Sequence, residues 1–177
     1  LAVVGIGISP ETELATSAGL DIENGITVDE FARTSNPNIY AAGDNTNHFN
    51  PLLGRHIRLE TWQNAQSQAA VAAQNMCGRN TIYAETPWVW SDQYDVNLQM
   101  AGQPADWNNL NVRGDLHSRD FIAFQLADGK IEAAIAVNRG RDMRVIRRIM
   151  DANVSVNIDD LANEKISMRD ILKSVTI

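Results

Sequence analysis

Two short stretches of the sequence combine residue types that could bind a cofactor. The first is Ile39-Tyr-Ala-Ala-Gly-Asp44, an apolar run that ends at a glycine and a carboxylate. The second begins sixteen residues later at Glu60, where the pattern predicts the start of an amphipathic helix. A carboxylate after a buried strand suits a sugar hydroxyl, and a helix N-terminus suits an electron-rich ring or a phosphate. We interpret the two stretches as half of a flavin site.

The elements that would position these stretches follow an α/β pattern up to about residue 83. The predicted order is a buried strand over 1–8, a helix over 11–18, a strand over 25–29, a buried strand over 39–42, a polar loop over 45–54 and a helix over 61–76. The last helix is expected to approach a sheet or cofactor through an apolar stripe of Trp62, Ala65, Ala69, Ala72, Ala73 and Met76.

The pattern changes after a linker at 83–87. Short antiparallel strands are predicted over 96–100, 121–126 and 131–137, and the last two are joined through Asp128-Gly129, a strong hairpin signal. A helix over 141–152 should bury Met143, Ile146, Ile149 and Met150. Short helical pieces are expected over 159–162 and 168–172. This half is therefore predicted to be a small α+β domain.

Composition limits the function classes. The chain has 177 residues, of which 44% are hydrophobic, so it can bury a core. A net charge of -7 argues against general binding to nucleic acids or anionic membranes. No apolar run is long enough for a transmembrane helix. The sequence has a single cysteine, Cys77, which excludes an internal disulfide, a C-x-x-C pair and a four-cysteine iron–sulfur site within this sequence. The low cysteine content also favours a reducing compartment, the cytoplasm, as the location of the protein.

The start of the chain predicts that it is a C-terminal fragment of a longer protein. It opens at Leu1, without methionine, inside what reads as a central strand. Gly5-Ile-Gly7 could begin a dinucleotide fingerprint, but Pro10 stands where the third glycine or alanine is required. A strand that ends in a glycine turn is the simpler interpretation.

The order and spacing of several short motifs are specific when they are taken together. They are Val4-Gly-Ile-Gly7 with Pro10, Gly19-Leu20, Asn24-Gly-Ile26 with Val28-Asp29, Thr34-Ser35, Pro37, Ile39-Tyr-Ala-Ala-Gly-Asp44, Arg58-Leu-Glu60 with Trp62, Asn64 and Ala65, and Trp90-Ser-Asp-Gln93. With these motifs the chain resembles the C-terminal part of FAD-dependent, NAD(P)H-linked ferredoxin reductases. These are glutathione-reductase-like flavoproteins that serve bacterial aromatic-ring dioxygenases (aromatic hydrocarbon catabolism) and cytochromes P450.

The resemblance implies a partial FAD/NAD(P)-binding α/β domain followed by a small α+β reductase domain. Residues 1–12 would end the NAD-binding domain, 13–83 would form the C-terminal part of the FAD-binding domain, and 84–177 would form the C-terminal reductase domain. The N-terminal G-x-G-x-x-G units of the family are not in this sequence. We therefore expect the fragment alone to bind FAD weakly and to be inactive.

The resemblance also implies an activity and a set of site residues. Hydride would pass from NAD(P)H, with NADH favoured, to FAD, and electrons would then pass singly to a ferredoxin-type [2Fe-2S] protein. Asp44 would bind ribityl or ribose hydroxyls, and Trp62, with Thr61 before it, would lie over the pyrimidine end of the flavin. Glu60 and Trp90 would lie near the nicotinamide side, and Gly5 in the NAD loop. No catalytic side chain and no metal ligand are expected.

Each of these residues also has a purely structural interpretation. Asp44 could be a turn acid, Glu60 an acid favoured by the helix dipole, and Trp62 or Trp90 a core aromatic. Residues expected to have only structural or solvent roles are Trp88 and Trp107 (packing), His48 and His56 (solvated) and Cys77 (a small buried hydrophobe).

A basic run within the acidic chain leaves two alternatives open. It consists of Arg139, Arg141, Arg144, Arg147 and Arg148. It could dock an acidic iron–sulfur partner near Arg144 and Arg148, or it could be a solvated helix face with ion-pair roles.

The alternative function for the protein is that of a flavoprotein like apoptosis-inducing factor, which senses NAD and uses its C-terminal domain for binding or assembly.

Overall fold

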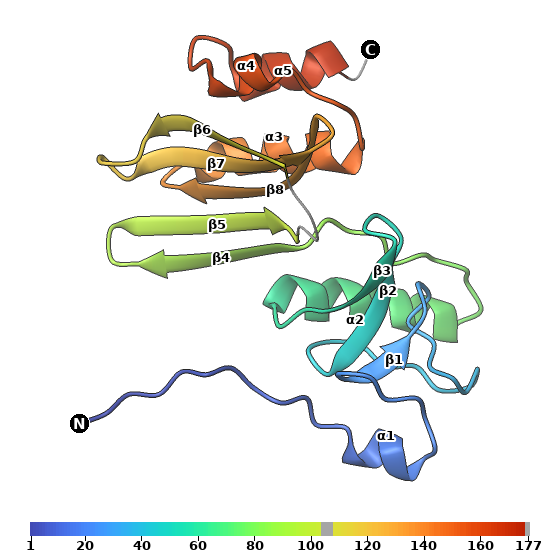
Figure 1. The fold of residues 1–177 in the computed structure, drawn as a ribbon. Coiled ribbons are helices and arrows are strands. Elements are labelled where there is room, and N and C mark those ends of the chain that lie inside the picture. The colour runs from blue at the N-terminus through green and yellow to red at the C-terminus, as the bar shows by residue number, and fades with distance from the viewer. Residues whose placement is uncertain (104–107, 176–177) are drawn as a thin grey trace. The chain divides into compact units, whose positions relative to one another are not determined.

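The computed structural model describes residues 1–103 and 108–175, and the chain forms two compact units, Leu1–Ala84 and Glu85–Ile177 (Figure 1). The first unit contains a three-stranded sheet and the second a five-stranded sheet. Within the described residues, no helix combines the length and the apolar character that crossing a membrane requires.

The first unit is a small mixed sheet with two helices. Its elements are α1 (Glu13–Ser17), β1 (Ile26–Val28), β2 (Thr46–Asn50), β3 (Arg55–Arg58) and α2 (Trp62–Met76). Strand β2 is central: it pairs with β1 in parallel and with β3 in antiparallel orientation. The apolar core is small, with buried Ala15, Ile26 and Val28 packed against Leu20 and Ala41.

Helix α2 faces the interior of its unit with polar residues, so the predicted apolar stripe is wrong. The buried residues of the helix are Asn64, Gln68, Ala72 and Asn75. Trp62 and Met76, the two ends of the predicted stripe, are exposed. The reason is that irregular backbone beside the helix needs hydrogen-bond partners. Asn75, for example, donates to the carbonyls of Phe31 and Thr81 and accepts from the Thr81 amide.

Three expected features of the first unit also differ. Residues 1–8 form no strand and are exposed, because no described strand offers them a ladder of hydrogen bonds. The stretch 39–42 is half-buried and contributes only a single bridge, between Tyr40 and Arg33. The expected loop 45–54 instead contains the buried strand β2, whose polar sequence hides the alternation that identifies strands.

The second unit is an antiparallel sheet with the strand order β4-β5-β8-β7-β6. The strands are β4 (Trp88–Gln93), β5 (Val96–Gly102), β6 (Asn109–Asp115), β7 (Asp120–Ala127) and β8 (Lys130–Val137). The predicted hairpin is confirmed, since β7 pairs with β8 across the Asp128-Gly129 turn. Both turn residues have positive φ, 51° and 79°, as two-residue hairpin turns of this type require.

Three helices share one apolar core with this sheet. They are α3 (Gly140–Asp151), α4 (Ile158–Ala162) and α5 (Met168–Val175). The predicted inner face of α3 is confirmed by buried Met143, Ile146 and Ile149. These side chains join a cluster that includes Ile122 and Phe124 of β7, both fully buried. The second unit therefore has a core of ordinary apolar character.

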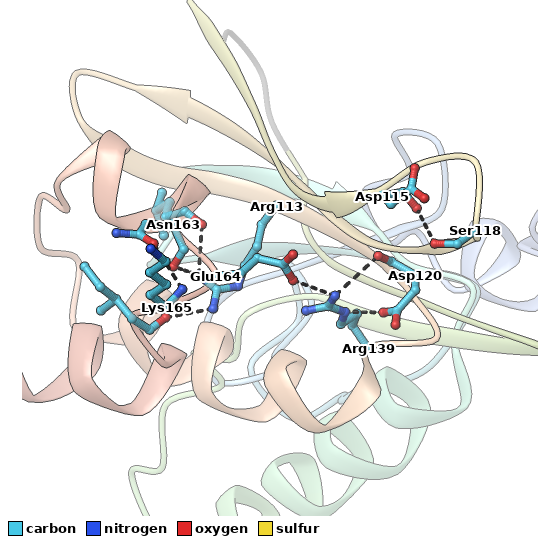
Figure 2. A network of polar contacts seen from close by, with 10 residues as sticks. Arg113, Asp115, Ser118, Asp120, Arg139, Asn163, Glu164 and Lys165 are labelled. Atoms are coloured by element: carbon cyan, nitrogen blue, oxygen red, sulfur yellow. Dashed lines mark hydrogen bonds and ion pairs between the residues drawn. The ribbon is translucent and has the colours of Figure 1, made fainter.

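Two arginines tie the sheet to the connection between α4 and α5 (Figure 2). Arg113 of β6 is buried, and its guanidinium donates to the carbonyls of Leu161, Asn163 and Ile166 at 3.2, 2.8 and 2.7 Å. Arg139 pairs with Asp120 and, at 2.7 Å, with Glu164. The hydrogen bond that the Arg139 guanidinium donates to the Asp120 carboxylate is the main reason that the pKa of Arg139 is raised. Arg139 thus has a structural role.

Candidate functional site

The turn that carries Asp44 is fixed by α2. The Gly43 amide donates to Oε1 of Gln68 at 2.8 Å, and the Thr46 hydroxyl donates to the same oxygen at 2.9 Å. Gly43 has a φ of 96°, a conformation that favours glycine. Asp44 follows it and is exposed, and its carboxylate has no hydrogen bond or ion pair with any described residue. The acid is therefore held in place while its oxygens stay available to a ligand.

The start of α2 is also fixed by a side-chain hydrogen bond. Thr61 caps the helix, because its side-chain oxygen accepts from the Asn64 amide at 3.2 Å. The first amides of the helix have no partner within it, and they add to the positive end of its dipole. Trp62, the first helical residue, is 64% exposed. The structure therefore presents an aromatic ring and a positive helix end on the surface of the first unit.

Arg58 connects the acid to the helix start. Its Nη1 donates to the Glu60 carboxylate at 2.5 Å and to the Asp44 carbonyl at 3.4 Å. Glu60 is thus an ion-pair partner that helps to hold the Asp44 turn. The sequence showed Arg58 only as part of a family motif, and nothing in its spacing indicated that it joins two of the candidate residues.

Two candidate residues belong to other segments of the chain. Gly5 belongs to the exposed segment 1–9, and no atom lies within 4 Å of the position a Cβ would occupy there. Trp90 belongs to the second unit, where it stacks on Trp88 with ring centroids 4.9 Å apart. Trp88 packs against the core, as expected, whereas Trp107 lies outside the described residues.

The histidines and the cysteine correct two expectations. His48 is fully buried on β2, and burial, helped by the charge of His56, lowers its pKa to about 4. His56 is exposed, as expected. Cys77 is exposed, because it follows α2 at the surface end of that helix. Among the described residues, no group of histidine, cysteine and acidic side chains could hold a metal ion.

The basic run on α3 divides into different environments. Arg144 and Arg148 are exposed and have no ion pair with a described residue. Arg147 is half-buried, with its guanidinium carbon 5.0 Å from the centroid of the Trp88 ring. Together with the ion-paired Arg139, these positions show that the run is not one uniform solvated face.

Comparisons with known proteins agree with the two-part organisation. The model of the pyridine nucleotide-disulphide oxidoreductase family matches residues 1–69, and the reductase C-terminal model matches residues 88–172. The ferredoxin–NAD(+) reductase component of the anthranilate 1,2-dioxygenase system of Burkholderia cepacia is 50% identical over 173 residues. The alignment covers 97% of this chain and 43% of that protein. The chain belongs to the FAD-dependent NAD(P)H:ferredoxin reductase family.

Other ferredoxin reductases support the same assignment. Putidaredoxin reductase of Pseudomonas putida is 35% identical over 97% of this chain and 41% of its own length. The solved covalent putidaredoxin reductase–putidaredoxin complex matches with a TM-score of 0.91 and 35% identity, over 96% of this chain and 41% of that chain. The solved ferredoxin reductase for the CYP199A2 system of Rhodopseudomonas palustris matches with a TM-score of 0.88 and 35% identity. This match covers 93% of the present chain and 41% of that chain. The predicted fold class is confirmed, and the chain spans about two fifths of the length of these relatives.

Proposed function

We propose that this chain is part of a flavoprotein that passes electrons from NAD(P)H, with NADH favoured, through FAD to a ferredoxin-type iron–sulfur protein. The observation that carries the proposal is the unpaired Asp44 carboxylate, held by Gln68 and Arg58 beside the capped start of α2. Such a set of groups suits the sugar-like chain and the electron-rich ring of a flavin. Relatives named as ferredoxin–NAD(+) reductases support the same function.

Each candidate residue has a proposed role in holding the cofactor. Asp44 would accept hydrogen bonds from ribityl or ribose hydroxyls. Thr61 and Trp62 would place the positive end of α2 at the pyrimidine end of the flavin, where negative charge develops on reduction. Glu60 and Trp90 would lie on the nicotinamide side, and Gly5 in the NAD loop. The bound FAD would supply the redox chemistry, accepting a hydride and releasing single electrons.

The domain assignment and the partner are part of the same proposal. Residues 1–12 would end the NAD-binding domain, 13–83 would complete the FAD-binding domain, and 84–177 would be the reductase domain. The partner would be an acidic [2Fe-2S] protein that docks near Arg144 and Arg148, which are exposed on α3. We propose the cytoplasm as the location, since a single cysteine fits a reducing compartment.

The affinity of the full-length protein for FAD tests the role of Asp44. Asp44→Asn keeps the shape of the side chain but removes its charge, so FAD should bind about ten- to a hundredfold more weakly. Flavin fluorescence during titration of the apoprotein would measure this change. Asp21→Asn is the matched control, because Asp21 is also an exposed acid of the first unit. An unchanged affinity in Asp44→Asn would contradict the proposed site.

A further inference from the structure

Trp88 and Trp90 form a stack on one face of β4. Residues two apart in a strand point to the same side, and these two rings lie 4.9 Å apart with an angle of 24° between their planes. Trp88 packs against the core of the second unit, whereas Trp90 is 39% exposed. Trp88 is therefore the anchored ring, and its orientation sets the surface on which Trp90 rests.

Arg147 of α3 makes the contact that fixes Trp88 from the helix side. Its guanidinium carbon lies 5.0 Å from the centroid of the Trp88 ring, within the range of a cation–π interaction. Nε of Arg147 is buried and has no hydrogen-bond partner among the described residues, and no ion pair in that part of the chain involves Arg147. The indole ring is thus the electrostatic partner that explains why this guanidinium is drawn inward.

The Trp88 ring borders a cavity into which it could rotate. A cavity of about 280 Å³ lies there, lined by Trp88, Gln99, Gly140, Met143, Arg144 and Arg147. A ring in a close-packed core has no alternative rotamer, but a ring beside a cavity can turn into the free volume. The attraction between the Arg147 guanidinium and the Trp88 ring opposes such a rotation.

We propose that Arg147 is a positioning residue: it holds Trp88 and, through the ring stack, fixes the orientation of Trp90. The inference rests on the proposed function, in which Trp90 lies near the nicotinamide side of the flavin. An arginine suits the task because its planar guanidinium can stack on an aromatic face. Arg147 therefore differs in role from Arg144 and Arg148, which face solvent.

Circular dichroism tests the contact without requiring bound flavin. Two stacked indoles at an angle to each other couple their transitions and give a paired positive and negative band, which Trp90→Phe would abolish and thereby assign. Arg147→Met should remove most of this signal, because a cation–π contact shifts the balance of ring orientations by about tenfold. Arg147→Lys keeps the charge and should retain the signal in part. Arg148→Met is the spectral control, since Arg148 makes no contact with either ring in the described structure.

Kinetics of the full-length holoprotein test the consequence. Arg147→Met should lower kcat for reduction of the iron–sulfur partner roughly three- to tenfold, with little change in the KM for that partner. Retention of the paired bands in Arg147→Met would overturn the proposal, and so would their loss with an unchanged kcat. Failure of the proposed function looks different: the unsubstituted full-length protein would then bind no FAD while its paired bands persisted.

Discussion

The imidazole of His48 makes the stability of this protein depend on pH. Its pKa is about 4 in the folded chain and near 6.5 when unfolded, so the unfolded chain binds more protons between these values. The free energy of unfolding should therefore fall by up to about 3 kcal/mol as the pH drops from 6.5 to 4, and His48 should add no slope above that range.

The variant His48→Leu tests this expectation. Neither ring nitrogen of His48 has a hydrogen-bond partner in the described structure, so leucine leaves no new unpaired group. Denaturant titrations at pH 7 and pH 4.5 should show a smaller loss of stability in His48→Leu than in the unsubstituted chain. His117→Leu, which replaces an exposed histidine, should behave like the unsubstituted chain. Equal losses in all three proteins would refute the role of His48.

Candidate site residues could be singled out from the sequence when their neighbours along the chain mark them. Asp44 and Trp62 stand out because a strand-like run or a helix start adjoins them. His48, Gln68 and Arg113 could not be found in this way, because their environments come from distant segments. The oxygen of Gln68 that holds Gly43 acts across 25 positions, and no periodicity records such a contact.

At the scale of elements, α2 joins the candidate site to its unit through side-chain amides. Replacing Gln68 with leucine would leave the buried Gly43 amide without its acceptor, whereas the Thr46 hydroxyl would keep the Gly43 carbonyl at 2.8 Å. We expect Gln68→Leu to lower the free energy of unfolding by about 1–3 kcal/mol, the cost of one buried donor left unpaired. Urea titration measures the change, and Gln66→Leu on the exposed side of the same helix is the control. A loss below 0.5 kcal/mol, the size of ordinary surface changes, would contradict this account.

Helices and strands could be predicted where the spacing of apolar residues in the sequence places them on the face that the folded protein buries. Helix α3 and the β7–β8 hairpin are such cases, since both bury apolar residues against one core. The helix expected over 61–76 is present as α2, but its predicted buried face was wrong, and β2 was expected to be a loop. Both elements bury amides or an imidazole, which the hydrophobic period does not reveal. The prediction also failed for residues 1–8, whose apolar run specifies a strand only when other strands pair with it.

At the scale of the whole molecule, the charge distribution makes a prediction about partner binding. The chain carries a net charge of -7, so the exposed Arg144 and Arg148 are a local exception to its overall sign. In the full-length protein, Arg144→Glu with Arg148→Glu should raise the KM for an acidic iron–sulfur partner and weaken the dependence of its reduction on salt. Stopped-flow measurements at several ionic strengths would show both effects.

A matched pair separates docking from net charge. Arg79→Glu with Arg119→Glu changes the total charge by the same amount at two exposed positions outside α3. This control should keep most of the original KM and salt dependence. If the two double variants behave alike, the basic face of α3 has no special part in docking.

The hydrogen bonds of Arg113 also impose an order on biosynthesis. The carbonyls that receive its guanidinium belong to residues 48, 50 and 53 positions further along the chain. At a translation rate of about 5–20 residues per second, Arg113 is added to the chain about 2–11 s before those carbonyls are made. Strand β6 therefore cannot bury this charge in its final environment until residues 161–166 have been made. The α4–α5 segment can close the second unit only after that point.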